Sequence, residues 1–205
     1  SLLLFLPGLI SSTGLPVHVP IHACVAGWHG RRPRAPRQPT SDDEDCFELM
    51  KRMLVEGMLF VLAAGLIVHV LYGNLGFCPT DEGYMLSGSR RILDGEIPHR
   101  DYISLRPVGT QILHAHLLLW AGENLIWWSR LLTWFEVAAT TWLWILIARH
   151  FSTEFQCARR RLIVAAIAFL AATNSFPIMP WNTYDALFFL SLGIVLHLFQ
   201  PRLSW

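Results

Sequence analysis

A long uninterrupted apolar stretch, residues 53–72, limits what this chain can fold into more than any other feature. An α-helix rises about 1.5 Å per residue, so roughly 20 apolar residues reach across the ~30 Å hydrocarbon core of a bilayer. Hydrophobic residues make up 53% of the chain and charged residues only 15%, whereas about 25% of the residues in a soluble domain are charged. We therefore expect an all-α, polytopic membrane protein.

The apolar pattern predicts four membrane crossings. A further apolar segment, residues 108–121, has only 14 residues, which is short of the ~20 that a perpendicular crossing needs. If that segment lies in the interface, the basic residues near 51 and those near 160 fall on one side of the membrane, as the positive-inside rule requires. Residues 73–127 then form one long outer loop, and residues 174–183 form a short one. The predicted crossings lie near residues 53–72, 131–148, 162–179 and 184–199.

The two ends of the sequence indicate a fragment of a longer chain. Residues 1–48 are rich in Pro, Gly and Arg and then acidic, a composition typical of a disordered or non-native extension. Residues 49–205 are expected to be the N-terminal part of a membrane domain. The net charge of +1 excludes a basic nucleic-acid-binding protein, because few phosphates would be neutralised. The four cysteines have no metal-binding or redox spacing.

Two helices are predicted within the outer loop. Thr80 is the expected N-cap of the first helix, an acidic pair fills its first turn, and Gly95 ends it. The apolar residues between them recur at helical spacing on one side, which is typical of a helix lying on a membrane surface. The second interfacial helix is predicted over residues 108–121. Tryptophans close to both segments fit an interfacial aromatic belt.

The outer loop resembles that of the GT-C glycosyltransferases, a superfamily of membrane enzymes that includes protein O-mannosyltransferases and aminoarabinose transferases. Members show an acidic pair after the first helix, an "LxxGxxPYRDY" passage, and a Pro-containing step into an apolar helix. This chain has Asp81-Glu82-Gly83-Tyr84, then Leu93-Asp94-Gly95-Glu96-Ile97-Pro98-His99-Arg100-Asp101-Tyr102, then Arg106-Pro107. Residues 121–124 and 129–131 are similar to the "FGxS…ARL" entry to the second crossing.

The resemblance implies a site at the outer membrane face. Family members have an active-site acid in the first loop, and the matching residue is Asp81, with Glu82 beside it. Arg100 and Arg106 are the candidates for binding the donor phosphate, because a guanidinium pairs well with phosphate oxygens. In the second outer loop, Asn182 and Asp185 are candidates for binding acceptor or donor. Some relatives hold a divalent cation between two such loops, to which Asp81 and Asp185 would contribute; no metal or other cofactor is assigned.

Each of these residues also has a purely structural interpretation. Acidic residues in a first helical turn complement the helix dipole, and Asn182 would serve as an N-cap. Arg100 and its neighbour Asp101 would pair with each other, and Arg106 would extend to lipid headgroups. Glu136, an acid inside a predicted crossing, is a functional candidate by its position, although a pair with Arg130 on the same helix is the simpler expectation.

The function expected from the resemblance is transfer of a sugar from a polyprenyl-phosphate donor to an acceptor hydroxyl, with inversion at the anomeric carbon. The expected location is a bacterial inner membrane, with the active site on the outer face. The alternative is a non-enzymatic membrane protein, such as a transporter half or a scaffold, or an inactive fragment of such a transferase. A transporter would place polar groups at the bilayer midplane on broken helices, whereas most polar residues here gather in the loops. The sugar and the acceptor are not identified by the sequence.

Overall fold

The computed structural model describes residues 41–175 and 179–199, and these residues form helices and loops without a strand. The all-α prediction is confirmed for these ranges. The chain divides into two units, residues 1–41 and 42–205, and the first lies outside the described residues except for Ser41. The predicted extension over residues 1–48 is therefore described only from Ser41, where a helix already begins. The acidic residues that follow Ser41 favour a helix start, because negative charge complements the helix N-terminus.

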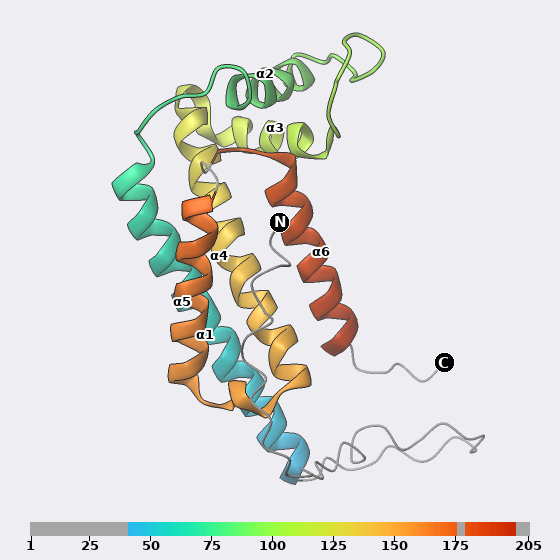
Figure 1. Ribbon diagram of the computed structural model, residues 1–205. Coiled ribbons are helices and arrows are strands. Elements are labelled where there is room, and N and C mark those ends of the chain that lie inside the picture. The colour runs from blue at the N-terminus through green and yellow to red at the C-terminus, as the bar shows by residue number, and fades with distance from the viewer. Residues whose placement is uncertain (1–40, 176–178, 200–205) are drawn as a thin grey trace, which may run out of the picture. The chain divides into compact units, whose positions relative to one another are not determined.

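Four helices run side by side, and two shorter ones lie across one end of the resulting bundle (Figure 1). The bundle helices are α1 (Ser41–Tyr72), α4 (Leu125–Phe151), α5 (Ala158–Ser175) and α6 (Asn182–Phe199). The crossing layer consists of α2 (Glu82–Leu93) and α3 (Gly109–Ala121), both from the predicted outer loop. Short 3₁₀ turns at Gly122–Asn124 and Thr153–Gln156 lead into α4 and α5.

Three of the described helices are long and apolar enough to span a membrane. They include Glu48–Tyr72 of α1, Leu125–Phe151 (α4) and Asn182–Phe199 (α6), with 25, 27 and 18 residues. Helix α5 is not among them, because three consecutive arginines, Arg159 to Arg161, occupy its first turn. The crossing predicted near residues 162–179 remains a prediction, and residues 176–178 lie outside the described part.

Helix α4 forms the centre of the bundle. In its most apolar stretch 61% of the residues are buried, against 17% for α1 and 11% for α6. Two clusters of apolar side chains fill the interior around it: Trp134, Val137, Ala138 and Phe169 toward the α2–α3 layer, and Met53, Trp142, Ile145, Leu146 and Ala165 toward the other end. The outer faces of α1 and α6 remain apolar and exposed.

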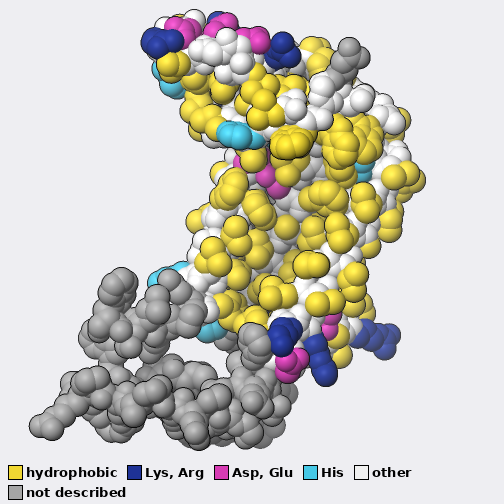
Figure 2. All heavy atoms as spheres, turned by 180° about the vertical axis from the view of Figure 1, so that it is seen from behind, with side chains coloured by type: hydrophobic (Ala, Val, Ile, Leu, Met, Phe, Trp, Pro, Cys, Tyr) yellow, Lys and Arg dark blue, Asp and Glu magenta, His cyan; other side chains and the backbone are white. Residues whose placement is uncertain are grey.

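The bundle sides are mainly hydrophobic between two charged ends (Figure 2). The helix directions in Figure 1 place Lys51, Arg149 and the arginines at the start of α5 at the end remote from α2 and α3. Arg161 is buried there and bonds to Glu56 of α1 and to two backbone carbonyls. The two basic groups seen in the sequence thus share one end of the bundle.

The boundaries of α2 and α3 lie close to the predictions, with one correction. Asp81 and not Thr80 is the N-cap residue of α2, and its side chain makes no capping hydrogen bond because it binds Arg106 instead. The helix ends as predicted before Gly95, whose φ of 91° lets its N–H bond to the Ile92 carbonyl. Helix α3 covers Gly109–Ala121, within a residue of the predicted segment.

Candidate functional site

Two of the predicted site residues meet beside the layer formed by α2 and α3. Arg106, just before α3, donates from Nη2 to Asp81 Oδ1 at 2.9 Å. The guanidinium carbon of Arg106 also lies 3.6 Å from the ring centre of Trp181, in the segment that leads into α6. The two side chains of the ion pair are each about 30% exposed. We call Asp81, Arg106 and Trp181 the outer cluster; it joins the two predicted outer loops at one place.

The second oxygen of Asp81 is also occupied. Cys78 Sγ lies 3.7 Å from Asp81 Oδ2, and the thiol is in contact with Thr80 as well. The carboxylate is thus held from both sides by the turn that precedes α2 and by the turn that precedes α3. The two oxygens of a carboxylate offer about four acceptor sites, so Asp81 can still accept a proton while these contacts hold it in place.

Glu82, the neighbour of Asp81, has a different environment. Its side chain is buried, and both of its carboxylate oxygens accept hydrogen bonds of 2.7 Å from Arg130 of α4. Arg130 also donates to the carbonyls of Gly73, Leu75 and Gly76 in the loop after α1. The pair therefore ties α4, α2 and the exit of α1 together. Glu82 presents no free oxygen to a substrate, and its geometry is that of a structural residue.

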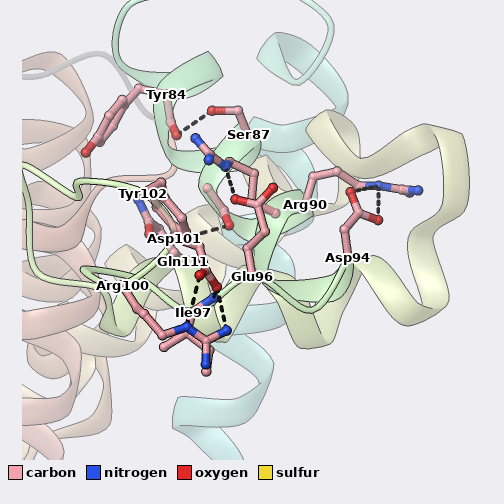
Figure 3. A network of polar contacts seen from close by, with 12 residues as sticks. Tyr84, Ser87, Arg90, Asp94, Glu96, Ile97, Arg100, Asp101, Tyr102 and Gln111 are labelled. Carbon is pink, nitrogen blue, oxygen red and sulfur yellow. Dashed lines mark hydrogen bonds and ion pairs between the residues drawn. The ribbon is translucent and has the colours of Figure 1, made fainter.

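Arg100 does not join the outer cluster. Its guanidinium bonds to the neighbouring Asp101 at 2.7 and 2.9 Å, and Asp101 also accepts from the backbone N–H of Ile97 (Figure 3). These hydrogen bonds, led by that of Arg100, lower the pKa of Asp101 to about 2. Arg100 and Asp101 therefore pair with each other, as the structural interpretation of the sequence expected.

The same passage fixes the loop between α2 and α3. The hydroxyl of Tyr102 donates to Gln111 Oε1 of α3 at 2.9 Å and lies 3.4 Å from the Gly88 carbonyl of α2 (Figure 3). The Tyr102 ring also packs under Arg91 at 4.3 Å. His99 adopts a φ of 66° and donates its N–H to the Tyr102 carbonyl, which turns the chain back. The motif that resembles "PYRDY" thus positions the layer that carries Asp81 and Arg106.

The second-loop candidates point inward. Asn182 begins α6, but its Oδ1 is buried without a hydrogen-bond partner, so it does not cap the helix. Asp185 is only 5% exposed. Its carboxyl interacts electrostatically with Glu136 of α4 and with His114 of α3. The structure therefore separates Asp185 from the Asp81–Arg106 pair and joins it to Glu136. The expected pair of Glu136 with Arg130 is wrong, because Arg130 is fully used by Glu82 and the three carbonyls.

The inner cluster, which we define as His114, Ser129, Glu136 and Asp185, was not recognised as one site in the sequence. His114 is fully buried, and its Nδ1 lies 2.9 Å from Ser129 Oγ. Burial lowers the pKa of His114, and the Asp185 charge opposes this shift. A signal was present: Ser129 and Glu136 recur with Thr133 at i, i+4 and i+7, a polar stripe on one face of an apolar helix.

Cavities near the outer end are shallow and lie beside α4. One of about 270 Å³ is lined by the loop after α1 together with Trp127 and Arg130, and one of about 320 Å³ by Asn124, Trp127 and Trp128. Asp81 and Arg106 line neither. Within residues 41–175 and 179–199, no three His, Cys, Asp or Glu side chains are arranged to hold a metal ion. The idea that Asp81 and Asp185 share a divalent cation therefore has no support in the described geometry.

No protein-family model, curated protein or solved structure matches this chain. The resemblance to GT-C glycosyltransferases therefore rests on the sequence motifs.

Proposed function

We propose that this chain belongs to an integral-membrane glycosyltransferase that moves a sugar from a polyprenyl-phosphate donor to an acceptor hydroxyl, with inversion at the anomeric carbon. The observation that carries the proposal is the outer cluster. Asp81 and Arg106 are 25 positions apart in the sequence yet lie 2.9 Å apart, and Trp181 from the second connecting segment covers the guanidinium. Such a transfer needs a base for the acceptor hydroxyl and a cationic group for the leaving phosphate, and a carboxylate and a guanidinium fit these two roles.

The position of the cluster supports its assignment to the outer membrane face. Lys51, Arg149 and the α5 arginines lie at the opposite end of the bundle, which the positive-inside rule makes the cytoplasmic end. In this proposal α5 crosses the membrane as α1, α4 and α6 do. Helices α2 and α3 lie in the outer interface, and the membrane is a bacterial inner membrane. Exposed apolar residues such as Ile103, Leu105 and Trp120 on this layer would contact lipid and the polyprenyl chain.

The chemistry assigns one role to each polar residue of the cluster. The acceptor oxygen attacks the anomeric carbon, the bond from that carbon to the phosphate oxygen breaks, and polyprenyl phosphate leaves. Asp81 takes the proton of the acceptor hydroxyl as general base. Arg106 stabilises the charge that develops on the leaving phosphate; it is 29% exposed and can contact Asp81 and a phosphate together, since a guanidinium carries five donors. Glu82 and Arg100, candidates from the sequence alone, have structural roles in this scheme.

The test is Asp81→Asn in the full-length protein, compared with Asp94→Asn. Asp94 lies in the same outer layer but is exposed and pairs only with Arg90. Transfer is measured with a panel of labelled polyprenyl-phosphate hexoses, pentoses and amino sugars in proteoliposomes. Loss of a general base lowers the rate about 10²- to 10⁴-fold, whereas the control variant keeps the wild-type rate. Equal rates for Asp81→Asn and wild type would remove the base assignment.

A non-enzymatic membrane protein is the second candidate, because both Asp81 oxygens are engaged by protein groups. Arg106→Lys separates the two functions. Lysine keeps the charge but loses the planar fork, so an enzyme loses affinity for inorganic or polyprenyl phosphate and turns over more slowly. A scaffold shows no phosphate binding in either form. Arg90→Lys, also in the outer layer, is the matched control.

A further inference from the structure

Within the bundle, an acidic pair lies where no positive charge balances it. Glu136 of α4 is 4% exposed and Asp185 of α6 is 5% exposed, and the two carboxyls are close enough to interact. Glu136 Oε2 and both oxygens of Asp185 have no other hydrogen-bond partner. Two ionised carboxylates in contact in an apolar interior repel each other and lose their hydration, so this arrangement is stable only if a cation or a proton is bound.

In the described part of the chain, no Lys or Arg side chain bonds to the pair. Arg130 of α4 is bonded to Glu82 and three carbonyls. Burial lowers the pKa of His114 of α3, which disfavours a positive charge on its ring, and the Asp185 charge opposes this shift. His69 of α1 stacks on Trp127, and Tyr184 of α6 carries a neutral hydroxyl without a partner. Helix α5 packs on α4 with the apolar side chains Ala165 and Phe169.

An independent observation also points to a bound ligand at this place. His114 is 0% exposed and its Nε2 has no hydrogen-bond partner, while its Nδ1 is fixed by Ser129. The ring therefore has an unsatisfied buried nitrogen, and Asp185 is close enough for its charge to act on this ring.

We propose that Glu136 and Asp185 form a proton-binding site inside the helix bundle, where the two carboxyls share one proton beside His114. A proton fits better than a metal ion, because the described residues include no group of three acidic, His or Cys side chains arranged for a metal. The shared proton removes one of the two charges and forms a strong hydrogen bond between carboxyl and carboxylate. This inference does not depend on the glycosyltransferase proposal.

The site is connected to the outer cluster by the first turn of α6. The N–H of Asp185 lies 3.5 Å from the carbonyl of Trp181, the residue whose ring covers Arg106. Loss of the shared proton would place two like charges between α4 and α6 and push the helices apart.

Infrared spectroscopy of the full-length protein in lipid nanodiscs near neutral pH tests the proposal. The wild type is expected to show the carbonyl stretch of one protonated carboxyl per chain, which shifts in D₂O. Glu136→Gln/Asp185→Asn should lose this band, whereas Asp81→Asn should keep it. A wild type without the band, or a double variant that retains it, would overturn the proposal. So would a band that appears only after divalent cations are chelated, because a metal ion would then hold the pair.

A second measurement removes the dependence on how well the double variant folds. In the wild type, the band should disappear on alkaline titration in a single step of one proton per chain. In Asp185→Asn, Glu136 has lost its like-charged neighbour, so its band should disappear at a lower pH than in the wild type. An unchanged titration in this variant would show that Glu136 does not share a proton with Asp185, and the proposed site would be refuted.

Discussion

Removal of the Arg130 guanidinium should destabilise the fold more than any other single change at the outer end of the bundle. Arg130→Met leaves the Glu82 carboxylate, 1% exposed, without its two 2.7 Å hydrogen bonds. It also leaves the carbonyls of Gly73, Leu75 and Gly76 without a donor. Breaking a buried ion pair by removing one partner costs about 3–5 kcal/mol. Two charge-assisted hydrogen bonds at about 1.5–3 kcal/mol each give about 3–6 kcal/mol, a similar range.

The measurement is thermal unfolding in detergent, followed by the loss of monodisperse protein. One kcal/mol corresponds to roughly 2–4 °C for a domain of this size, so we expect the midpoint to fall by about 6–20 °C. Glu82→Leu/Arg130→Met should recover part of the loss, because no buried charge is left unpaired. Additive effects of the two changes, or a fall of only about 1 °C in Arg130→Met, would refute the assignment of this pair as the clamp of the outer layer.

Two further predictions concern the α2–α3 layer. Gly88→Ala should destabilise the protein by about 1–3 kcal/mol, because a Cβ at this position would lie 2.4 Å from the side-chain amide of Gln111. Tyr102 holds that amide in place. Gly109→Ala is the control in the same thermal assay, because a Cβ there meets nothing within 4 Å. The Asp101 carboxyl has a folded-state pKa of about 2, below its ordinary value of 3.8, so its contribution to stability is complete above about pH 4 and is lost as the pH falls toward 2. Carbon NMR of the labelled carboxyl checks this directly, and Arg100→Gln should return the pKa toward its ordinary value.

Much of the architecture could be predicted from the sequence, because the apolar segments are long and strongly biased. The positions of α1, α4 and α6, the two shorter helices α2 and α3 and the common location of the basic residues all follow from hydrophobic length and charge distribution. Helix α5 was harder, because its arginines shorten the apolar stretch within Ala158–Ser175. The local sequence of such a helix is the same whether the helix crosses the membrane or only packs in the bundle with a charged first turn.

The site was predicted only in part, because partners distant in the sequence decide each role. Arg106 and Arg100 are equally basic and lie in the same loop before α3, yet only Arg106 bonds to Asp81, since Asp101 pairs with Arg100. Asp185 follows a loop and was assigned to the outer site, whereas the first turn of α6 carries it inward to Glu136. Local sequence identifies residues with chemical potential, but pairing depends on which helix faces meet.

The adjacent acids Asp81 and Glu82 show why a sequence motif does not equal a site. Successive residues in a helix point about 100° apart, so two neighbours at a helix start cannot both face the same partner. Asp81 is turned toward the surface and meets Arg106, whereas Glu82 is turned into the bundle and meets Arg130. Each orientation supports the other, because the buried pair fixes the start of α2 and thereby the place of the exposed carboxylate. An exchange of the two residues would put the shorter side chain against Arg130 and should abolish both contacts, even though the pair of acids would remain in the sequence.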